Sequence, residues 1–475
     1  MSLIGLELND AGILAAGGSP PGLLELDGQG RESPGFALPQ KTGLLVGKTA
    51  ERKAHLFPRQ ILTRFWDQLN TEALEQTGKY FPLNHAEIVY RHLSLIWQQI
   101  QNHGDQIVMA VPSYYEREHL GLLLGIAQEL GMPVKGFVPL SLAASSHVEP
   151  DPKRMLLYLD IHLHSVEITY LEQGDNLTVR DYATTPDKGL LHLHRKLVDM
   201  IAQEFVRTTR FDPFHQAASE QQLYDRLPGV LSHLQHNSSM EFEIIGGATP
   251  YSITLEYDRI VHQAESVYSE ILRLISRMQN KRGQGQTPLA LQLSHRLARL
   301  PGCKEMLARL EDARISELDR GAAASGLLQI WHQLAAQGNK EGISFFTSRP
   351  WQRQQQTDGT RPSTEKKAQT RPTHLLYRSI AYPIAEIPLT IGCNQDNARN
   401  HVTITGATAG VSPVHCSVVH RDGEIILNVI SDQETFVDDI RVSGNISLRL
   451  GQIIRVGNSG EQFQVIACLN SSEKK

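Results

Sequence analysis

A break in composition divides the chain into two regions that must fold separately. Residues 347–374 contain three prolines, a run of glutamines and almost no apolar side chains. Six Lys and Arg against two acidic residues give this stretch a formal charge of +4. So few apolar residues cannot offset the entropy cost of ordering the segment, and we therefore expect a flexible basic linker. Contact of this linker with nucleic acid or an anionic lipid surface is the alternative.

The overall composition is that of an ordinary globular protein. The 475 residues include 40% hydrophobic and 20% charged side chains, and the net charge of −5 gives no general case for a nucleic-acid partner. No apolar run reaches the ~18 residues that an integral membrane segment needs, and Glu7 and Asp10 argue against a signal peptide. The four cysteines lack metal-ligand spacing, which indicates reduced thiols. We expect a cytoplasmic bacterial protein.

The region before the linker, residues 1–346, alternates strand-like and helical patterns. Strands are predicted at 3–8, 106–111, 156–159, 166–171 and 289–293. Helices are predicted at 86–101, 117–130, 190–207, 258–279 and 303–311, where apolar residues recur every three or four positions. The alternation of the two kinds of element predicts an α/β architecture.

Several segments of this region, read in order, resemble the DnaK-type branch of the actin-like ATPases. They are IGLELNDA at 4–11, LLVGKTA at 44–50, VMAVPSYY at 108–115, GFVPLSLAA at 136–144, PDKGL at 186–190, LSHRLARLPG at 293–302 and GAAA at 321–324. Residues 155–170, MLLYLDIHLHSVEITY, predict strand, tight turn and strand where that family carries Asp-x-Gly-Gly-Gly-Thr. The resemblance implies a duplicated, ribonuclease-H-like fold that holds ATP and magnesium between two lobes.

The first phosphate-binding turn of that family is altered in this chain. Glu7 replaces an aspartate, which still allows it to hold the water shell of a magnesium ion. Asn9 and Asp10 replace a glycine and a hydroxyl residue that contact phosphate. Asp10 would place a negative charge beside a polyanion, so this turn is expected to bind phosphate poorly.

The second phosphate-binding turn is altered more strongly. Asp160 is kept, but His162, Leu163 and His164 occupy the glycine positions, and Ser165 replaces the threonine. A phosphate-binding turn needs residues that tolerate a positive φ and let backbone N–H groups approach the anion closely. Large side chains obstruct both, so we expect the phosphate site to be lost.

Other cleft positions have changed as well. Val138 stands in place of the glutamate that positions the attacking water, and an apolar side chain cannot polarise water. Asp187 keeps the place of an aspartate, whereas Ser294 and His295 replace two glycines of the adenosine pocket. Pro228 is expected to interrupt the helix that packs against adenine. We therefore expect no enzymatic activity and no bound cofactor, while binding of ATP with magnesium stays open.

The histidines raise the alternative of a metal site in the vacated pocket. His162 and His164 are two positions apart, and His192 and His194 repeat that spacing. No cysteine or closely spaced carboxylate joins them. We expect these rings to fill the space that the glycines leave for nucleotide, with no metal bound. Arg64 falls near the catalytic lysine of the family, in an uncertain register.

The region after the linker, residues 375–469, has short alternating strand patterns separated by Gly, Asp and Asn turns. This pattern predicts an antiparallel β-sandwich of ~90 residues, followed by a disordered tail at 470–475. Four motifs are similar to those of forkhead-associated (FHA) domains: Gly392-Cys393, SPVH at 412–415, QETFVDD at 433–439 and LGQIIRVG at 450–457. The resemblance implies a sandwich whose loops bind phosphothreonine.

The phosphate-binding loops of the FHA-like region also differ from the family. Cys393 replaces the arginine that would contact phosphate, and a phosphate dianion needs such a charge-assisted donor. Ser412 keeps a hydroxyl, His415 keeps the histidine that braces the loop, and Thr435 is retained. Gln433 replaces an asparagine that holds the peptide backbone. Two arginines, Arg399 and Arg421, are candidates for the missing cation.

The sequence as a whole predicts a non-catalytic scaffold or adaptor that docks protein partners. It combines an actin-like domain with altered nucleotide positions and an FHA-like domain with altered phosphate-binding loops. A slow ATP-binding switch is one alternative. A phosphothreonine-reading adaptor with a phosphoprotein partner is the other.

Overall fold

The computed structural model divides the chain into two compact units, Met1–Gln356 and Thr357–Lys475. It describes all residues except 1, 19, 27–29, 42, 75–82, 148, 150, 248, 282–286, 337–342, 352–372, 378–379, 386, 394–399, 405–409, 422–423, 439, 458–460 and 467–475. Most of the expected linker and the expected tail 470–475 lie outside the described residues. Each unit is considered by itself.

The first sheet of the first unit has the strand order β15-β7-β6-β1-β2-β3. Strand β1 pairs antiparallel with β2 and parallel with β6, and β6 pairs parallel with β7. The strands are β1 (Leu3–Glu7), β2 (Leu14–Gly17), β3 (Gly22–Leu23), β6 (Gln106–Val111), β7 (Val134–Pro139) and β15 (Ser344–Phe345).

The second sheet repeats this arrangement, with the strand order β14-β13-β8-β9-β10-β16. Strands β8, β9 and β10 form an antiparallel meander, and β8 then pairs parallel with β13, which pairs parallel with β14. The strands are β8 (Met155–Ile161), β9 (Ser165–Gln173), β10 (Asn176–Pro186), β13 (Leu289–Leu293), β14 (Ala313–Glu317) and β16 (Ser348–Pro350). The first unit thus contains one topology twice. Strand β16 lies within the stretch expected as linker and pairs with β10.

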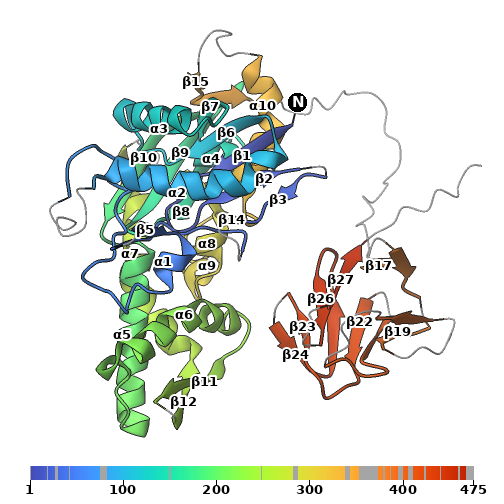
Figure 1. Ribbon diagram of the computed structural model, residues 1–475. Coiled ribbons are helices and arrows are strands. Elements are labelled where there is room, and N and C mark those ends of the chain that lie inside the picture. The colour runs from blue at the N-terminus through green and yellow to red at the C-terminus, as the bar shows by residue number, and fades with distance from the viewer. Residues whose placement is uncertain are drawn as a thin grey trace, which may run out of the picture. The chain divides into compact units, whose positions relative to one another are not determined.

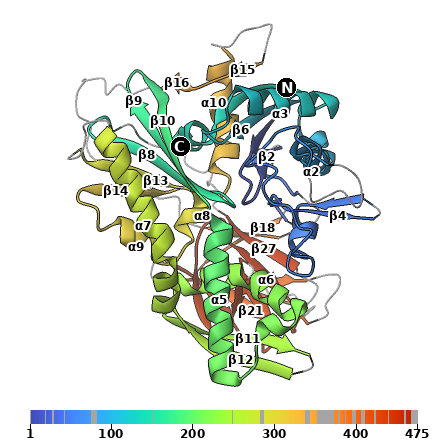
Figure 2. The same ribbon diagram turned by 90° about the vertical axis from the view of Figure 1, so that its left-hand side faces the viewer.

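Helices separate and cover the two sheets (Figures 1 and 2). Helices α2 (His85–Ile100) and α3 (Arg117–Glu129) share a buried apolar cluster with one face of the first sheet. Helices α4 (Leu140–Ala144) and α10 (Ala322–Ala335) lie between the sheets, in a cluster that contains residues of β6 and β8. Helices α5 (Leu190–Thr209) and α7 (Tyr257–Lys281) cover the outer face of the second sheet.

Small residues let α10 approach the first sheet closely. A Cβ atom at Gly5 of β1 would lie 2.1 Å from the carbonyl oxygen of Ala324 in α10. A Cβ at Gly326 of α10 would lie 2.0 Å from the carbonyl oxygen of Ala143 in α4. These glycines therefore fix the spacing of the central layer, where larger residues would push the helix away from the strands.

Smaller elements complete the first unit. A hairpin of β11 (Ser239–Gly246) and β12 (Thr249–Glu256) packs beside α5 and α6 (Ala217–Leu234). The others are β4 (Ala37–Gln40), β5 (Gly43–Val46), α1 (Lys48–Glu51), α8 (His295–Ala298), α9 (Cys303–Leu307) and the 3₁₀ turns η2 (Gln101–His103), η3 (Ser145–His147) and η4 (Pro213–His215).

The predicted strands and helices are all present, with ends that shift by a few residues. The helix expected at 303–311 ends earlier, at Leu307. The expectation that Pro228 interrupts a helix is wrong, because α6 continues from Ala217 to Leu234 through this residue. The apolar face of α6, which buries Leu223, Leu227 and Leu231, holds the helix together at the cost of one backbone hydrogen bond.

The second unit is a sandwich of two β-sheets around one buried apolar cluster. One sheet has the order β18-β17-β27-β26-β23-β24 and the other β20-β19-β21-β22-β25. All pairs are antiparallel except β19 with β20, which is parallel. The strands are β17 (His374–Tyr377), β18 (Ile380–Pro383), β19 (Leu389–Gly392), β20 (His401–Thr403), β21 (Cys416–Arg421), β22 (Glu424–Val429), β23 (Thr435–Val437), β24 (Ile440–Val442), β25 (Asn445–Leu448), β26 (Ile453–Val456) and β27 (Glu461–Ile466).

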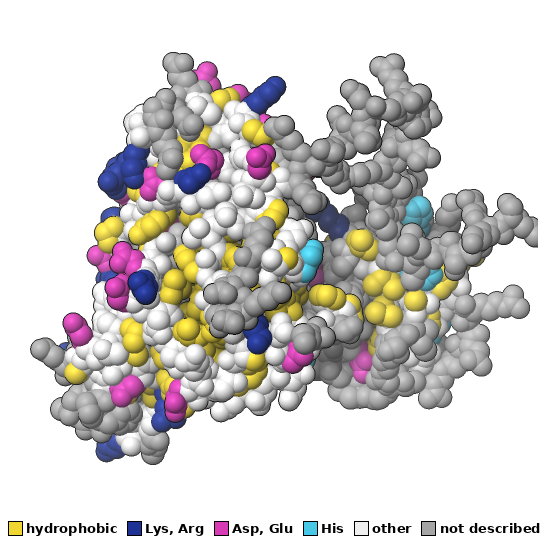
Figure 3. All heavy atoms as spheres, turned by 90° about the horizontal axis from the view of Figure 1, so that it is seen from above, with side chains coloured by type: hydrophobic (Ala, Val, Ile, Leu, Met, Phe, Trp, Pro, Cys, Tyr) yellow, Lys and Arg dark blue, Asp and Glu magenta, His cyan; other side chains and the backbone are white. Residues whose placement is uncertain are grey.

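No helix among the described residues is long and apolar enough to cross a membrane. On the face seen in Figure 3, Lys and Arg side chains alternate with Asp, Glu and apolar ones, without a continuous basic stripe among the residues described there.

Candidate functional site

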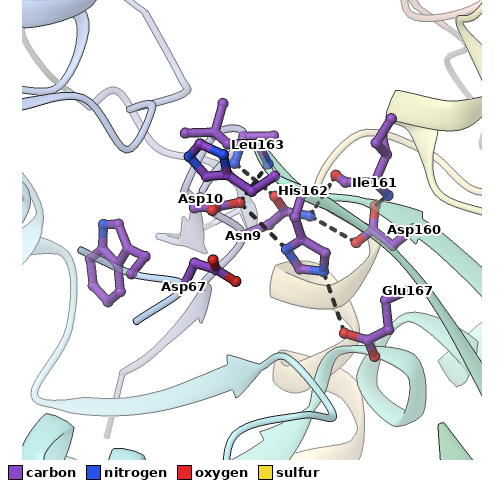
Figure 4. Close-up of polar contacts among 12 residues, drawn as sticks. Asn9, Asp10, Asp67, Asp160, Ile161, His162, Leu163 and Glu167 are labelled. Atoms are coloured by element: carbon purple, nitrogen blue, oxygen red, sulfur yellow. Dashed lines mark hydrogen bonds and ion pairs between the residues drawn. The ribbon is translucent and has the colours of Figure 1, made fainter. Parts of the chain in front are cut away.

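The two turns expected to bind phosphate meet in the first unit and are bonded to each other (Figure 4). The Asn9 side chain, after β1, donates from Nδ2 to Oδ2 of Asp160 at 2.9 Å and to the carbonyl oxygen of Ile161 at 3.2 Å. Asp10 Oδ1 accepts a hydrogen bond of 2.8 Å from the backbone N–H of Leu163. The space between the turns is therefore closed by direct hydrogen bonds.

His162 lies inside this contact, between two buried carboxylates (Figure 4). Its Nδ1 is 3.5 Å from Asp10 Oδ1, and its Nε2 is 3.4 Å from Glu167 Oε2. These distances are those of ion pairs rather than of good hydrogen bonds. Burial opposes the charge on His162, but Asp10 and Glu167 outweigh it and raise the pKa of the imidazole to about 10. The ring is therefore a buried cation at neutral pH.

The N-terminus of α5 packs directly on the second turn. A Cβ at Gly189 would lie 2.4 Å from the backbone nitrogen of Ser165, so only glycine fits. The N–H groups of Leu190 and Leu191 donate to the carbonyl oxygens of His162 and Leu163 at 2.8 and 3.0 Å. Helix N-termini bind anions through such free N–H groups. Here these two groups already have protein acceptors.

Glu7 is buried and paired. Its Oε1 accepts from Arg296 Nη1 at 3.0 Å, and its Oε2 accepts from the N–H of Ala324 at 3.3 Å. Burial raises the pKa of Glu7, and the Arg296 charge partly opposes that rise. The carboxylate is thus committed to a protein cation. Arg296 directly follows His295 in the chain, but the sequence motif gave no signal that it is the ion-pair partner of Glu7.

The remaining cleft positions, Val138, Asp187, Ser294 and His295, are packed against or bonded to other residues of the protein. Val138 is fully buried in the apolar layer between the sheets. Asp187 is exposed and forms an ion pair with Arg64. Ser294 caps α8 by accepting from the N–H of Leu297 at 3.4 Å, and His295 is 8% exposed.

The paired histidines do not converge. His164 turns away from His162 and contacts the carbonyl oxygen of Thr63 through Nε2 at 3.1 Å. His164 and His192 line a cavity of about 630 Å³, while His194 lines another. Within the described residues, no group of three or more His, Cys, Asp or Glu side chains is placed to hold a metal ion.

Contacts between His55, in the turn that follows α1, and α6 border the 630 Å³ cavity. The His55 ring stacks on Tyr224 with centroids 3.5 Å apart, and its Nδ1 is 3.1 Å from Glu220 Oε1. The His55 N–H also donates to Gln221 Oε1 at 2.9 Å. These contacts join residues that lie about 165 positions apart in the chain.

In the second unit, the motif residues bring two loops together. A Cβ at Gly392 would lie 2.0 Å from the carbonyl oxygen of Pro413, so glycine allows the close approach. The Cys393 N–H donates to Ser412 O at 3.1 Å, and its Sγ donates to Val411 O at 3.3 Å. The thiol at the arginine position therefore supports the neighbouring loop.

His415 holds the loop from inside. The ring is fully buried, accepts from the Ser412 N–H through Nδ1 at 3.4 Å and contacts Thr435 Oγ1 through Nε2 at 3.0 Å. Burial lowers the pKa of His415, so the ring is neutral at physiological pH. The ring thus contacts both Ser412 and Thr435, which lie on either side of strands β21 and β22 in the chain.

Ser412 has a hydroxyl partner that the sequence motifs missed. Its Oγ lies 2.5 Å from Ser431 Oγ, which also accepts from the N–H of Gln433 at 3.0 Å. Arg421 ends β21, whereas Ser412 precedes that strand. Five residues of strand extend ~17 Å, so Arg421 is not beside Ser412. The other candidate cation, Arg399, lies outside the described residues.

Residues 389–457 match the model of the FHA domain family. No curated protein matches the chain. The resemblance to FHA domains is thereby confirmed for this segment, and such domains are phosphopeptide-binding protein-interaction modules. The two mixed sheets of the first unit are without a family assignment.

Proposed function

We propose that the protein is a non-catalytic adaptor in which an actin-like pseudo-ATPase unit accompanies an FHA domain. The FHA match carries the protein-interaction part of this proposal. The direct bonding of the two turns through Asn9, Asp10 and His162 is the observation that carries the non-catalytic part.

The duplicated strand order supports an actin-like relationship for the first unit. In both sheets, an antiparallel meander of three strands precedes two parallel strands, and helices lie between the sheets. The sequence segments that resemble DnaK-type proteins include the turns after β1 and β8. Equivalent positions in the two halves therefore face each other, as expected for a duplicated fold with a central cleft.

Electrostatics argues against a nucleotide triphosphate between these turns. A phosphate group there would lie beside Asp10, and two unit charges ~4 Å apart repel by roughly 4 kcal/mol at an effective dielectric constant of about 20. The Leu163 N–H, which would have to bind phosphate, donates to Asp10 instead. In addition, the buried Val138 stands where the resemblance implies a water-positioning glutamate, and its apolar side chain cannot polarise water.

A ligand-binding test addresses the pseudo-ATPase assignment directly. Ligands that bind only the folded state stabilise it by RT ln(1 + [L]/Kd), so the unfolding temperature rises with ligand concentration and with affinity. We expect no rise of the unfolding temperature of the full chain with MgATP or MgADP at millimolar concentration. A rise that increases with nucleotide concentration and is lost on Asp160→Asn would instead support the slow ATP-binding switch.

Phosphothreonine binding is the second candidate function, for the FHA domain specifically. The bracing contacts of His415 with Ser412 and Thr435 are retained and favour it. Binding of a phosphothreonine peptide library and of its unphosphorylated counterpart to the full chain distinguishes the possibilities. Selective phosphopeptide binding, lost on Ser412→Ala, would establish a phosphothreonine reader. Equal binding of both libraries would favour docking through other contacts.

A further inference from the structure

The hairpin of β11 and β12 is a two-stranded sheet of its own at one end of the first unit (Figures 1 and 2). Each strand has eight residues, more than any strand at an edge of the other sheets that the structure describes. One face of the hairpin is buried in the apolar cluster of α5 and α6 through Phe242, Ile244, Ile253 and Leu255. The hairpin therefore has two long edges whose backbone groups find no partner in the large sheets.

The edge of β11 is capped by side chains of α6, which lies on that side of the hairpin in both views (Figures 1 and 2). The Gln222 amide accepts from the Ile245 N–H and donates to the Ile245 carbonyl oxygen, both at 3.1 Å. Arg226 donates to the carbonyl oxygen of Glu243. These side chains take the place of a neighbouring strand, so another strand could pair there only by displacing them.

The edge of β12 has no such cap. The Tyr257 N–H donates to the Ser238 carbonyl oxygen at 2.9 Å, and this bond fixes which residues of the hairpin point toward each other. The N–H and C=O groups of Ser252 and Thr254 therefore point away from β11, as does Pro250, which has no N–H. In the part of the chain that the structure describes, no strand or side chain bonds to these groups of Ser252 and Thr254. Such unpaired backbone groups are a template for another strand.

The solvent-facing side of the hairpin is acidic. Residues 239–256 contain three glutamates and no Lys, Arg or His. Glu241, Glu243 and Glu256 are exposed, on the face opposite the buried one. Among the described residues, only the Glu241 carboxylate is bonded, to the Ser252 hydroxyl at 2.8 Å. A basic strand would bring opposite charges beside these carboxylates, whereas a second copy of β12 would bring like charges.

We propose that the outer edge of β12 binds an extended segment of a partner protein in which basic residues alternate with apolar ones. The backbone of this segment pairs with the outward groups of Ser252 and Thr254 and adds a third strand to the hairpin. Because successive side chains of a strand point to opposite faces, the apolar residues continue the buried face beside Tyr251 and Leu255. The basic residues then lie on the solvent-facing side, next to Glu256.

This edge gives the adaptor a docking surface in its first unit, in addition to the FHA domain. Neither the turns at Asp10 and His162 nor the loop at Ser412 contributes a residue to it. Failure of peptide binding at β12 therefore leaves the nucleotide and phosphopeptide tests unaffected, and their failure leaves this surface unaffected.

Three labelled peptides test the chemistry of the partner on the full chain. They are Lys-Val-Lys-Val-Lys-Val-Lys, the block peptide Lys-Lys-Lys-Lys-Val-Val-Val and the acidic peptide Glu-Val-Glu-Val-Glu-Val-Glu. We expect fluorescence anisotropy to show saturable binding of the alternating Lys peptide and at least tenfold weaker binding of the other two. The block peptide has the same charge, so equal binding of both Lys peptides would reflect only attraction to the net charge of −5 and would overturn the proposal. Equal binding of the acidic peptide would overturn the basic character of the partner.

Substitutions at Thr254 place the binding at this edge. Thr254→Pro removes one outward N–H and keeps the bonds to β11, because proline is tolerated where the N–H of an edge strand faces solvent. We expect at least tenfold weaker binding of the alternating Lys peptide. Thr254→Val is the matched control, because valine keeps the N–H and suits a strand. Unchanged binding in Thr254→Pro, or an equal loss in Thr254→Val, overturns the site.

A charge variant tests the partner's basic residues without altering the backbone. E243Q/E256Q should reduce the preference for the alternating Lys peptide over the acidic one at least threefold. E118Q/E129Q is the matched control, because both of its carboxylates are exposed on α3. An unchanged preference in E243Q/E256Q, or an equal reduction in E118Q/E129Q, overturns the charge argument. In analytical ultracentrifugation, a dimer of the chain that is lost in Thr254→Pro would identify a second copy as the occupant and overturn the proposed partner.

Discussion

Replacement of Asp10 by alanine tests the contact between the two turns most directly. The substitution removes the acceptor of the Leu163 N–H, which lies 2.8 Å from Asp10 Oδ1. It also removes one of the two carboxylates beside the buried His162. Both partners remain buried after the change, so neither can be fully hydrated.

The size of the loss follows from these two contacts. A buried donor without an acceptor costs about 1–3 kcal/mol, and breaking a buried ion pair costs about 3–5 kcal/mol. The two terms overlap, because His162 can release its proton once Asp10 is gone. We therefore expect Asp10→Ala to lower the free energy of unfolding of the first unit by about 3–5 kcal/mol. Asp10→Asn keeps an acceptor for Leu163 and should cost less.

Tryptophan fluorescence in a urea titration measures this loss. The four tryptophans, Trp66, Trp97, Trp331 and Trp351, all lie in the first unit, so the signal reports on that unit alone. Asp175→Ala is the matched control, because the Asp175 side chain is exposed. Surface substitutions of this kind change stability by about 0.5 kcal/mol or less.

A small effect would refute the reasoning. If Asp10→Ala destabilises no more than Asp175→Ala, the turns are not held together by Asp10. Equal losses in Asp10→Ala and Asp10→Asn would show that the charge, rather than the hydrogen bond to Leu163, dominates.

Three other perturbations test separate parts of the structure. The pKa of His162 is raised from 6.5 to about 10, so its stabilising contribution is complete below pH 6.5 and is lost as pH rises through about 10. Urea titrations at increasing pH should show this loss in the wild-type chain and not in His162→Gln; parallel profiles would contradict it. Cys393→Arg restores a charge-assisted donor, and we expect calorimetry to show at least tenfold tighter binding of a phosphothreonine peptide, worth about 1.5–3 kcal/mol; unchanged affinity would exclude position 393 from the phosphate site. Pro228→Ala supplies an N–H for the Tyr224 carbonyl inside α6, so urea titration should show a gain of about 1–3 kcal/mol; a loss would mean that packing of the proline ring contributes more stability than the recovered hydrogen bond.

The secondary structure of the first unit was accessible from local patterns where apolar residues are periodic. The strands at 106–111 and 289–293 and the long helices appear where the sequence predicts them. Pro228 misled the prediction, because the rule for helix interiors weighs one lost hydrogen bond and ignores the apolar face that α6 buries. The hairpin of β11 and β12 is not among the predicted strands, although Phe242 and Ile244 in β11 and Ile253 and Leu255 in β12 alternate with polar residues, which is the pattern of a half-buried strand.

The candidate sites could be located from the sequence, but their bonding could not. Motif order placed Asn9, Asp10 and His162 in the turns, and the structure brings them into contact. Their partner Glu167 lies on β9 inside an ordinary strand pattern. Ser431 is similarly an unremarkable loop residue until the fold brings it beside Ser412. Such pairings join residues distant in sequence, and a single sequence carries no signal for them.

The pairing of β15 with β7 has a consequence for synthesis of the protein. Ser344 pairs with Gly136, 208 positions earlier in the chain, and α10, which covers β1 and β2, begins only at Ala322. A ribosome therefore exposes the apolar inner face of the first sheet long before its covering helix exists. Contacts of such long sequence separation form slowly, and exposed apolar sheet faces promote aggregation. The nascent first unit thus depends on being kept from other chains until nearly 350 residues have emerged.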